Sequence, residues 1–109
     1  MTTKHKRSSA RAKLEKHAGG ALTLGMLVRA IREGEGWSLA DLAGRLDVTR
    51  AFLGNIENGK PVSPEAAARY AKTLGYAEEQ FVRLALQDQV RRAGLKYEVA
   101  VRRLVAIPA

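Results

Sequence analysis

The chain has 109 residues, no cysteine, and 19 lysines and arginines against 11 aspartates and glutamates, a formal net charge of +8. This length predicts one small domain with terminal tails, and the lack of cysteine excludes disulfides, thiolate zinc sites and cysteine nucleophiles. The apolar stretches are far shorter than the ~20 residues of a membrane span, and no apolar segment follows the basic start as in a secretion signal. We therefore expect a cytoplasmic protein with no membrane partner. The charge favours a polyanionic partner without identifying it.

Residues 1–20 are predicted to be a basic arm. Met1–His17 contains six lysines and arginines and one glutamate, so most of the excess charge lies here. The apolar content is too low for a helix in this arm to be stable alone. A solvated tail is the interpretation we favour, and an arm that contacts the polyanionic partner is the alternative. His5 and His17 are the two histidines, without converging ligands, so we expect no metal and no cofactor.

Apolar residues at helical spacing predict five helices between residues 23 and 93. Thr23, Ser38, Thr49 and Ser63 stand where N-caps are expected, and Ser38 with Asp41 has the spacing of a capping box. The predicted helices cover 23–36, Ser38–Leu46, Thr49–Asn58, Ser63–Leu74 and approximately Glu78–Ala93. The core of the first three is predicted to contain Leu27, Ile31, Trp37, Leu42, Leu46, Val48, Leu53 and Ile56.

Two features near the C-terminus differ from this pattern. The apolar residues of the fifth predicted helix cover more than one face, as in a helix with an additional partner. Beyond Gly94 the period changes, and alternating apolar residues in Tyr97–Ile107 favour a strand. Leu104 and Arg103 interrupt the alternation, so a short basic helix stays open.

The pair of short helices Ser38–Leu46 and Thr49–Asn58 is the most informative unit. The tight joint between them predicts a steep crossing angle, typical of a helix-turn-helix. The second helix turns small or polar residues outward, and these are Arg50, Ala51, Gly54 and Asn55. The spacing Gly54-x4-Gly59-Lys60 imitates a phosphate-binding P-loop, but a helix precedes it and Pro61 follows, so we reject that interpretation. No base for nucleophilic catalysis lies near the serines, and we expect no enzyme.

The segment from Leu24-Gly25 to Leu74-Gly75 resembles the Cro and lambda-repressor type (Xre-like) helix-turn-helix. The resemblance rests on LVRAIREGEGWSLADLAGRLDVTRAFLGNIENGK, followed by SPEAAARYAKTLGY. Within it, LADLAGRLDVTRAFLGNIENG is similar to the family pattern eLAekLGVsrsyISrIErG. The resemblance implies an all-α fold, a five-helix lambda-repressor-like domain, and double-stranded DNA as the partner.

The resemblance also implies roles for individual residues. Those expected at base edges in the major groove are Arg50, Ala51 and Asn55, with Phe52 at the groove wall. Those expected at the sugar-phosphate backbone are Ser38, Thr49, Asn58, Gly59 and Lys60. Arg32 and Glu57 match an ion pair that ties the first family helix to the end of the third.

The sequence departs from the family at several positions. Leu39 stands where the family often has a glutamine that clamps phosphate, so that contact is in doubt. Asp47 replaces the usual glycine of the turn, and aspartate tolerates a left-handed backbone better than most residues. Gly44 and Gly54 lie inside helices and each cost up to about 1 kcal/mol relative to alanine. Gly54 either lets its helix approach the groove floor or is a neutral surface substitution.

We expect a sequence-specific, DNA-binding transcriptional regulator, a dimeric repressor on an inverted-repeat operator. The expected parts are the arm 1–20, the helix-turn-helix domain 21–94 and a C-terminal extension 95–109 that serves in dimerisation. One alternative is an antitoxin-type regulator whose C-terminal part binds a partner protein. The other is an interaction or RNA-binding adaptor that keeps the fold without reading DNA.

Overall fold

The computed structural model describes residues 22–105, and within this range the chain forms five α-helices and no strand. The predicted arm 1–20 and the end of the predicted strand, Ile107, lie outside the described residues. After Val62 the chain divides into two compact units. None of the helices in the described range is long and apolar enough to cross a membrane.

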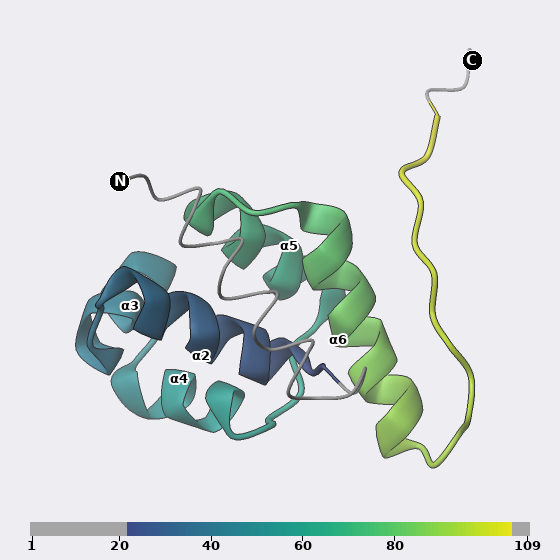
Figure 1. Cartoon of the computed structure of the whole chain (residues 1–109), viewed down its shortest axis with the longest axis horizontal. Helices are drawn as coiled ribbons and strands as arrows, with labels where there is room; N and C mark the ends of the chain where they lie inside the picture. The colour runs from purple at the N-terminus through teal and green to yellow at the C-terminus, as the bar shows by residue number, and fades with distance from the viewer. Residues whose placement is uncertain (1–21, 106–109) are drawn as a thin grey trace. The chain divides into compact units, whose positions relative to one another are not determined.

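The first unit contains α2 (Leu24–Glu35), α3 (Leu39–Leu46) and α4 (Arg50–Glu57), with α4 packed against both α2 and α3 (Figure 1). Each helix begins after its predicted cap, because the side-chain oxygen of Thr23, Ser38 or Thr49 accepts a backbone N–H from the first turn. α2 ends at Gly36, whose φ of 76° lies in the left-handed region that favours glycine.

The core of the first unit follows the predicted apolar stripes. Leu42 and Leu53 are completely buried, and Leu27, Ile31, Leu46 and Ile56 are buried with them. The prediction was wrong for two positions, because Trp37 and Val48 are only half-buried. The Trp37 ring instead lies under the Arg45 guanidinium, whose Cζ is 4.1 Å from the ring centroid. A guanidinium over the ring face gives a favourable cation–π contact, so this tryptophan is stabilised without being buried in the core.

The second unit contains α5 (Pro64–Leu74) and α6 (Glu78–Arg92), which pack against each other. Ser63 caps α5 ahead of Pro64, and Gly75 ends it with φ 76°. Buried residues in this unit include Ala67, Tyr70, Ala71 and Leu74 on α5 and Phe81, Leu84, Ala85 and Gln87 on α6.

The all-α prediction is confirmed, but neither structure predicted for the C-terminal extension is present in residues 95–105. This stretch forms neither helix nor strand, and after the turn at Gly94 it runs back beside α6 (Figure 1). A strand is assigned when its backbone pairs with another strand, and within the described chain no other strand exists. The alternating sequence therefore gives an extended conformation without a ladder.

Candidate nucleic-acid interface

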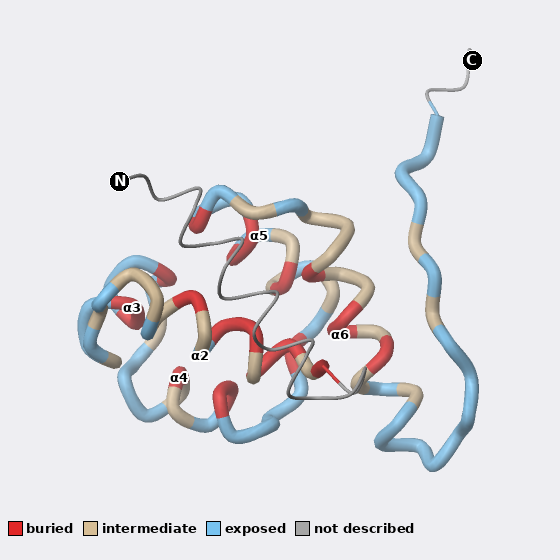
Figure 2. Tube along the Cα trace, in the orientation of Figure 1, coloured by how far each residue is buried: buried red, intermediate tan, exposed pale blue. Residues whose placement is uncertain are grey.

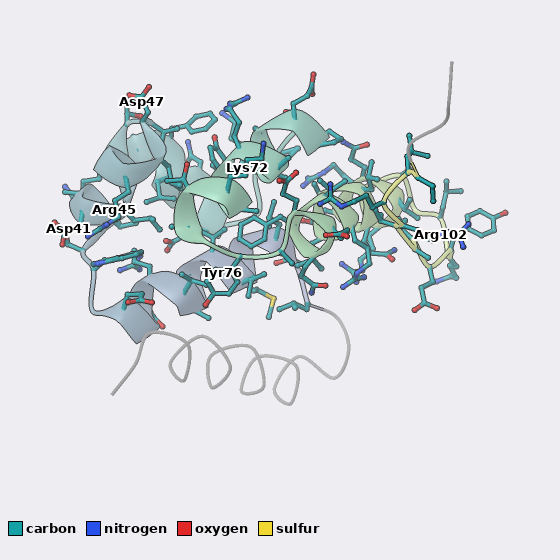
Figure 3. All side chains as sticks on the ribbon, turned by 90° about the horizontal axis from the view of Figure 1, so that it is seen from above. Asp41, Arg45, Asp47, Lys72, Tyr76 and Arg102 are labelled. Atoms are coloured by element: carbon teal, nitrogen blue, oxygen red, sulfur yellow. The ribbon has the colours of Figure 1, made fainter. Side chains whose placement is uncertain are left out.

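Three residues join α3 to α4, and the backbone of the first makes the turn. Asp47 ends α3 with φ 58° and ψ 46°, and among the described residues it is the one non-glycine with positive φ. The amides of Asp47 and Val48 donate to carbonyls of the last turn of α3, at 3.3 and 3.0 Å. Asp47 thus adopts the left-handed conformation that the family pattern assigns to glycine. Its side chain projects from the surface (Figure 3).

α4 presents one face to solvent and buries the other. Arg50, Ala51 and Asn55 are exposed, and Leu53 and Ile56 are buried. Within residues 22–105, the side chains of Arg50 and Asn55 take no part in any hydrogen bond or ion pair. Gly54 lies on this outward side, and a Cβ added there would meet no atom within 4 Å. Within the described residues, the exposed face therefore carries the Arg50 guanidinium and the Asn55 carboxamide without partners, and no side chain fills the position of Gly54.

The amino end of α4 is open to an anion. Thr49 Oγ1 accepts the amide of Phe52 at 3.0 Å, which leaves the amides of Arg50 and Ala51 directed outward. The first turn of α4 contains no acidic residue. Since the first amides of a helix have no intrahelical partner and the helix dipole is positive there, this end attracts phosphate.

The amino end of α3 is more enclosed. The Ser38 amide donates to Asp41 Oδ2 and the Asp41 amide to Ser38 Oγ, each at 3.0 Å. The hydrogen bond from the Ser38 backbone amide, followed by one from the Ser38 side chain, lowers the pKa of the Asp41 carboxyl below its ordinary value. Ser38 is exposed, as a phosphate contact requires, but the Asp41 carboxylate already occupies the position of an anion. Leu39 adds no polar group beside it.

The carboxyl end of α4 folds back on the helix. The amides of Asn58, Gly59 and Lys60 all donate to carbonyls of the last turn, at 2.9–3.1 Å. Lys60 Nζ lies 4.6 Å from the centroid of the Phe52 ring. The structure thus brings Phe52 and Lys60 together, with the ammonium held over the half-buried ring. Asn58 is exposed at the helix end.

Arg32 and Glu57 form a bidentate ion pair between α2 and α4. Arg32 Nε and Nη2 donate to the two Glu57 carboxylate oxygens at 2.8 and 3.1 Å, and Nη1 donates to the Trp37 carbonyl at 3.2 Å. Only 4% of the Glu57 side chain and 14% of the Arg32 side chain are exposed. The hydrogen bond to Glu57 raises the pKa of Arg32. The pair fixes the far end of the exposed helix to the core.

Two residues with close contacts inside the first unit were not singled out from the sequence. A Cβ at Gly25 would overlap the Ile56 carbonyl oxygen, so α2 can approach the end of α4 only with glycine at this position. Glycine in the first turn of an apolar helix was the available signal. Arg45, stacked on Trp37, is the second, and Figure 3 shows it on α3 near Asp41. Nothing in the periodicity indicated that stacking.

The described part of the first unit, residues 22–62, carries no net charge, because it contains five lysines and arginines and five acidic residues. Within this range, attraction to a polyanion depends on where single groups lie, such as the open amino end of α4. In the described part of the chain, no group of three or more histidine, cysteine, aspartate or glutamate residues is arranged to hold a metal ion.

A comparison with known protein families finds a match. The family model described as a helix-turn-helix domain matches residues 23–84, which is more than half of the chain and begins at the Thr23 cap. No curated protein and no solved structure matches the chain. The matched range contains α3 and α4, the two helices of the turn described above. The chain belongs to the helix-turn-helix domain family, within the Xre/Cro-like superfamily.

Proposed function

We propose that this protein is a sequence-specific regulator of transcription that reads double-stranded DNA by placing α4 in the major groove. The observation that carries the proposal is the contrast between the two faces of α4. One face is buried and tied to α2 through Glu57, and the other offers Arg50 and Asn55 without partners among the described residues. The groove is about 12 Å wide and admits one helix with its side chains.

Contacts to the sugar-phosphate backbone set the position of α4 in the groove. The amides of Arg50 and Ala51 and the Thr49 hydroxyl meet one phosphate at the amino end of the helix. Lys60, held over Phe52 and next to Asn58, meets the backbone beyond the carboxyl end. Ser38, which is exposed, donates its hydroxyl proton to a phosphate in place of the Asp41 carboxylate, which takes that position on the free protein. These contacts give affinity for any duplex and no sequence preference.

Sequence preference comes from the side chains that face the groove floor. Arg50 donates two hydrogen bonds to guanine O6 and N7, and Asn55 pairs in the same way with adenine N6 and N7. Ala51 and the edge of Phe52 fit against thymine methyl groups. Each bidentate contact discriminates by about 1–3 kcal/mol against the wrong base.

One such helix reaches few base pairs, too few for selectivity among the many competing sites of a genome. We therefore propose a two-fold dimer on an inverted repeat, with half-sites about 10–10.5 base pairs apart, that represses transcription by occupying its operator in the nucleoid of the cytoplasm.

The test is a selection of bound duplexes from a random pool with the full chain. The selected duplex, a scrambled duplex of equal length and a single-stranded RNA are then compared over a range of salt concentrations. We expect an inverted repeat that binds at least about a thousandfold more tightly than the scrambled duplex. A pool without enrichment, or equal binding to RNA, would reject sequence-specific DNA reading and favour an adaptor.

A further inference from the structure

The C-terminal segment, residues 95–105, is fastened to α6 by one buried side chain. Gln87 Nε2 donates to the Tyr97 carbonyl and Gln87 Oε1 accepts the Val99 amide, both at 2.8 Å. The Gln87 residue is only 6% exposed. Arg103 Nε forms an ion pair with Glu79 Oε2 at 3.7 Å, and Glu79 lies near the start of α6, before Gln87. The segment therefore runs back along α6 after the turn at Gly94.

The Gln87 amide acts on this segment as a neighbouring strand would. A carbonyl at one residue and an amide two residues later point to the same side of an extended chain. In a parallel sheet one residue of the neighbouring strand bonds both, with its N–H to the carbonyl and its C=O to the amide. The backbone groups of Tyr97 and Val99 therefore point toward Gln87. Those of Glu98, Ala100 and Arg102 point to the opposite side, because direction alternates with each residue.

This second backbone edge is unoccupied within residues 22–105. No hydrogen bond from the described chain reaches the N–H or C=O groups of Glu98, Ala100 or Arg102. The large apolar side chains that are exposed in the described range all lie in the segment: Leu95, Tyr97, Leu104 and Val105. Figure 2 shows the segment exposed over nearly its whole length. An open edge with apolar neighbours is a site for pairing with another strand.

We propose that the C-terminal segments of two copies pair as antiparallel strands, with Ala100 opposite Ala100 of the partner subunit. The proposal deepens the proposed function, since it rests on the dimer proposed there and names its interface. In this register Glu98, Ala100 and Arg102 face their counterparts in hydrogen-bonded pairs and exchange about six backbone hydrogen bonds.

The segment is complementary to itself in this register. Glu98 lies opposite Arg102 of the partner subunit, and the two-fold axis repeats this opposite-charge pair. Val99 lies opposite Val101 of the partner subunit, a pair of β-branched side chains that suits a sheet. Leu95 lies opposite Val105 of the partner subunit, which removes two exposed apolar side chains from water at each end. Glu98 and Arg102 are both exposed on the described chain, and Figure 3 shows Arg102 on the segment.

Charge reversal tests the register. Glu98→Arg places arginine opposite arginine twice, and Arg102→Glu places glutamate opposite glutamate twice. Each variant alone should dimerise about tenfold more weakly or worse by sedimentation equilibrium. An equimolar mixture of the two restores both opposite-charge pairs and should dimerise as the unmodified chain does, and so should the double variant. Lys96→Glu, which changes the net charge as Arg102→Glu does but lies opposite Leu104 of the partner subunit, should have no effect.

A single cysteine tests the same register by chemistry, because the chain has none of its own. Ala100→Cys places two Cα atoms about 5.5 Å apart, within the range of a disulfide. Glu98→Cys places them about 13 Å apart or more, four residues along the strand, beyond that range. We expect mild oxidation to link the first variant rapidly and the second hardly at all, without DNA present.

The outcomes separate this proposal from the proposed function. A monomeric full chain, equal cross-linking at both positions, or a mixture that dimerises no better than its components would overturn the pairing. The duplex selection could still succeed after any of these results. Conversely, cross-linking at Ala100→Cys would stand even if no duplex were enriched. A full chain that is monomeric until a different protein is added would overturn self-pairing in favour of a partner protein.

Discussion

α3 and α4 have the same length, eight residues each, and both are capped by a hydroxyl side chain. They differ at the amino end, where the first backbone amides of a helix lack intrahelical partners. α3 carries an acid in its first turn that closes the capping box, whereas α4 has no acid there and leaves two amides outward. α4 is closed instead at its carboxyl end, through Glu57 and the three returning amides. A helix held at its far end can present its amino end to an anion, while one closed at its amino end mainly supports the fold.

The largest expected effect on stability comes from removing the ion pair that holds the carboxyl end of α4. Glu57→Gln removes the carboxylate from a buried pair and leaves the Arg32 guanidinium uncompensated, so we expect a loss of about 3 kcal/mol in unfolding free energy. Glu33→Gln is the matched control, because Glu33 is 62% exposed in a 3.6 Å pair with Arg29. That change should cost under about 0.5 kcal/mol. Denaturant unfolding of both variants measures the difference, and equal costs would contradict an anchoring role for Glu57.

One glycine inside each helix, Gly44 on α3 and Gly54 on α4, allows the exposed faces of the two helices to be compared. A Cβ at Gly44 on α3 or Gly54 on α4 would meet no atom within 4 Å, so Gly→Ala at either position should stabilise the protein by up to about 1 kcal/mol. On DNA the two variants should differ. Gly54→Ala adds a methyl to the surface placed in the groove and should weaken binding to the selected duplex, whereas Gly44→Ala should not. Unchanged affinity of Gly54→Ala would make Gly54 a neutral surface substitution.

Lys60 tests the carboxyl end of the reading helix. Lys60→Ala should weaken the selected and the scrambled duplex alike and reduce the slope of log affinity against log salt by about 1, because one phosphate contact is lost. Lys72→Ala, an exposed lysine of the second unit, serves as the control. A loss confined to the selected duplex would assign Lys60 to base reading instead.

The smallest expected effect is on the capping box of α3. The pKa of Asp41 is lowered in the folded state, so its contribution to stability is present above an unfolded pKa of about 4 and is lost as pH falls through the lower folded value. The unfolding free energy of the unmodified chain should therefore fall more steeply below pH ~4 than that of Asp41→Asn. Parallel pH profiles for the two proteins would show that the carboxylate does not hold the cap.

Much of the fold followed from local patterns in the sequence. Caps such as Thr23 and Ser63 act over three residues, and the buried stripes repeat every three or four, so both can be read directly. The left-handed turn at Asp47 also follows from its position between two helices. The family resemblance, rather than any pattern, supplied the partnership of Arg32 with Glu57, because these residues are 25 positions apart.

What the sequence did not predict depends on contacts between distant segments. The stacking of Arg45 on Trp37 and the close approach at Gly25 appear only when the helices are packed. Gln87 is the clearest case. It follows Phe81 and Leu84 on one stripe of α6, and a polar residue on a buried stripe is a sign of a buried hydrogen-bond partner. The partner itself, the backbone of residues 97–99, required the structure.

The central claim, that α4 reads base sequence through its open face, is tested most directly by the selectivity of Arg50→Ala. Arg45→Ala, the arginine of α3, is its matched control. Affinities of the unmodified chain and both variants are measured on the selected and the scrambled duplex at one salt concentration. We predict that Arg50→Ala loses about 1–3 kcal/mol on the selected duplex and almost nothing on the scrambled one, while Arg45→Ala keeps the full ratio between them. Equal losses of Arg50→Ala on both duplexes would contradict the claim.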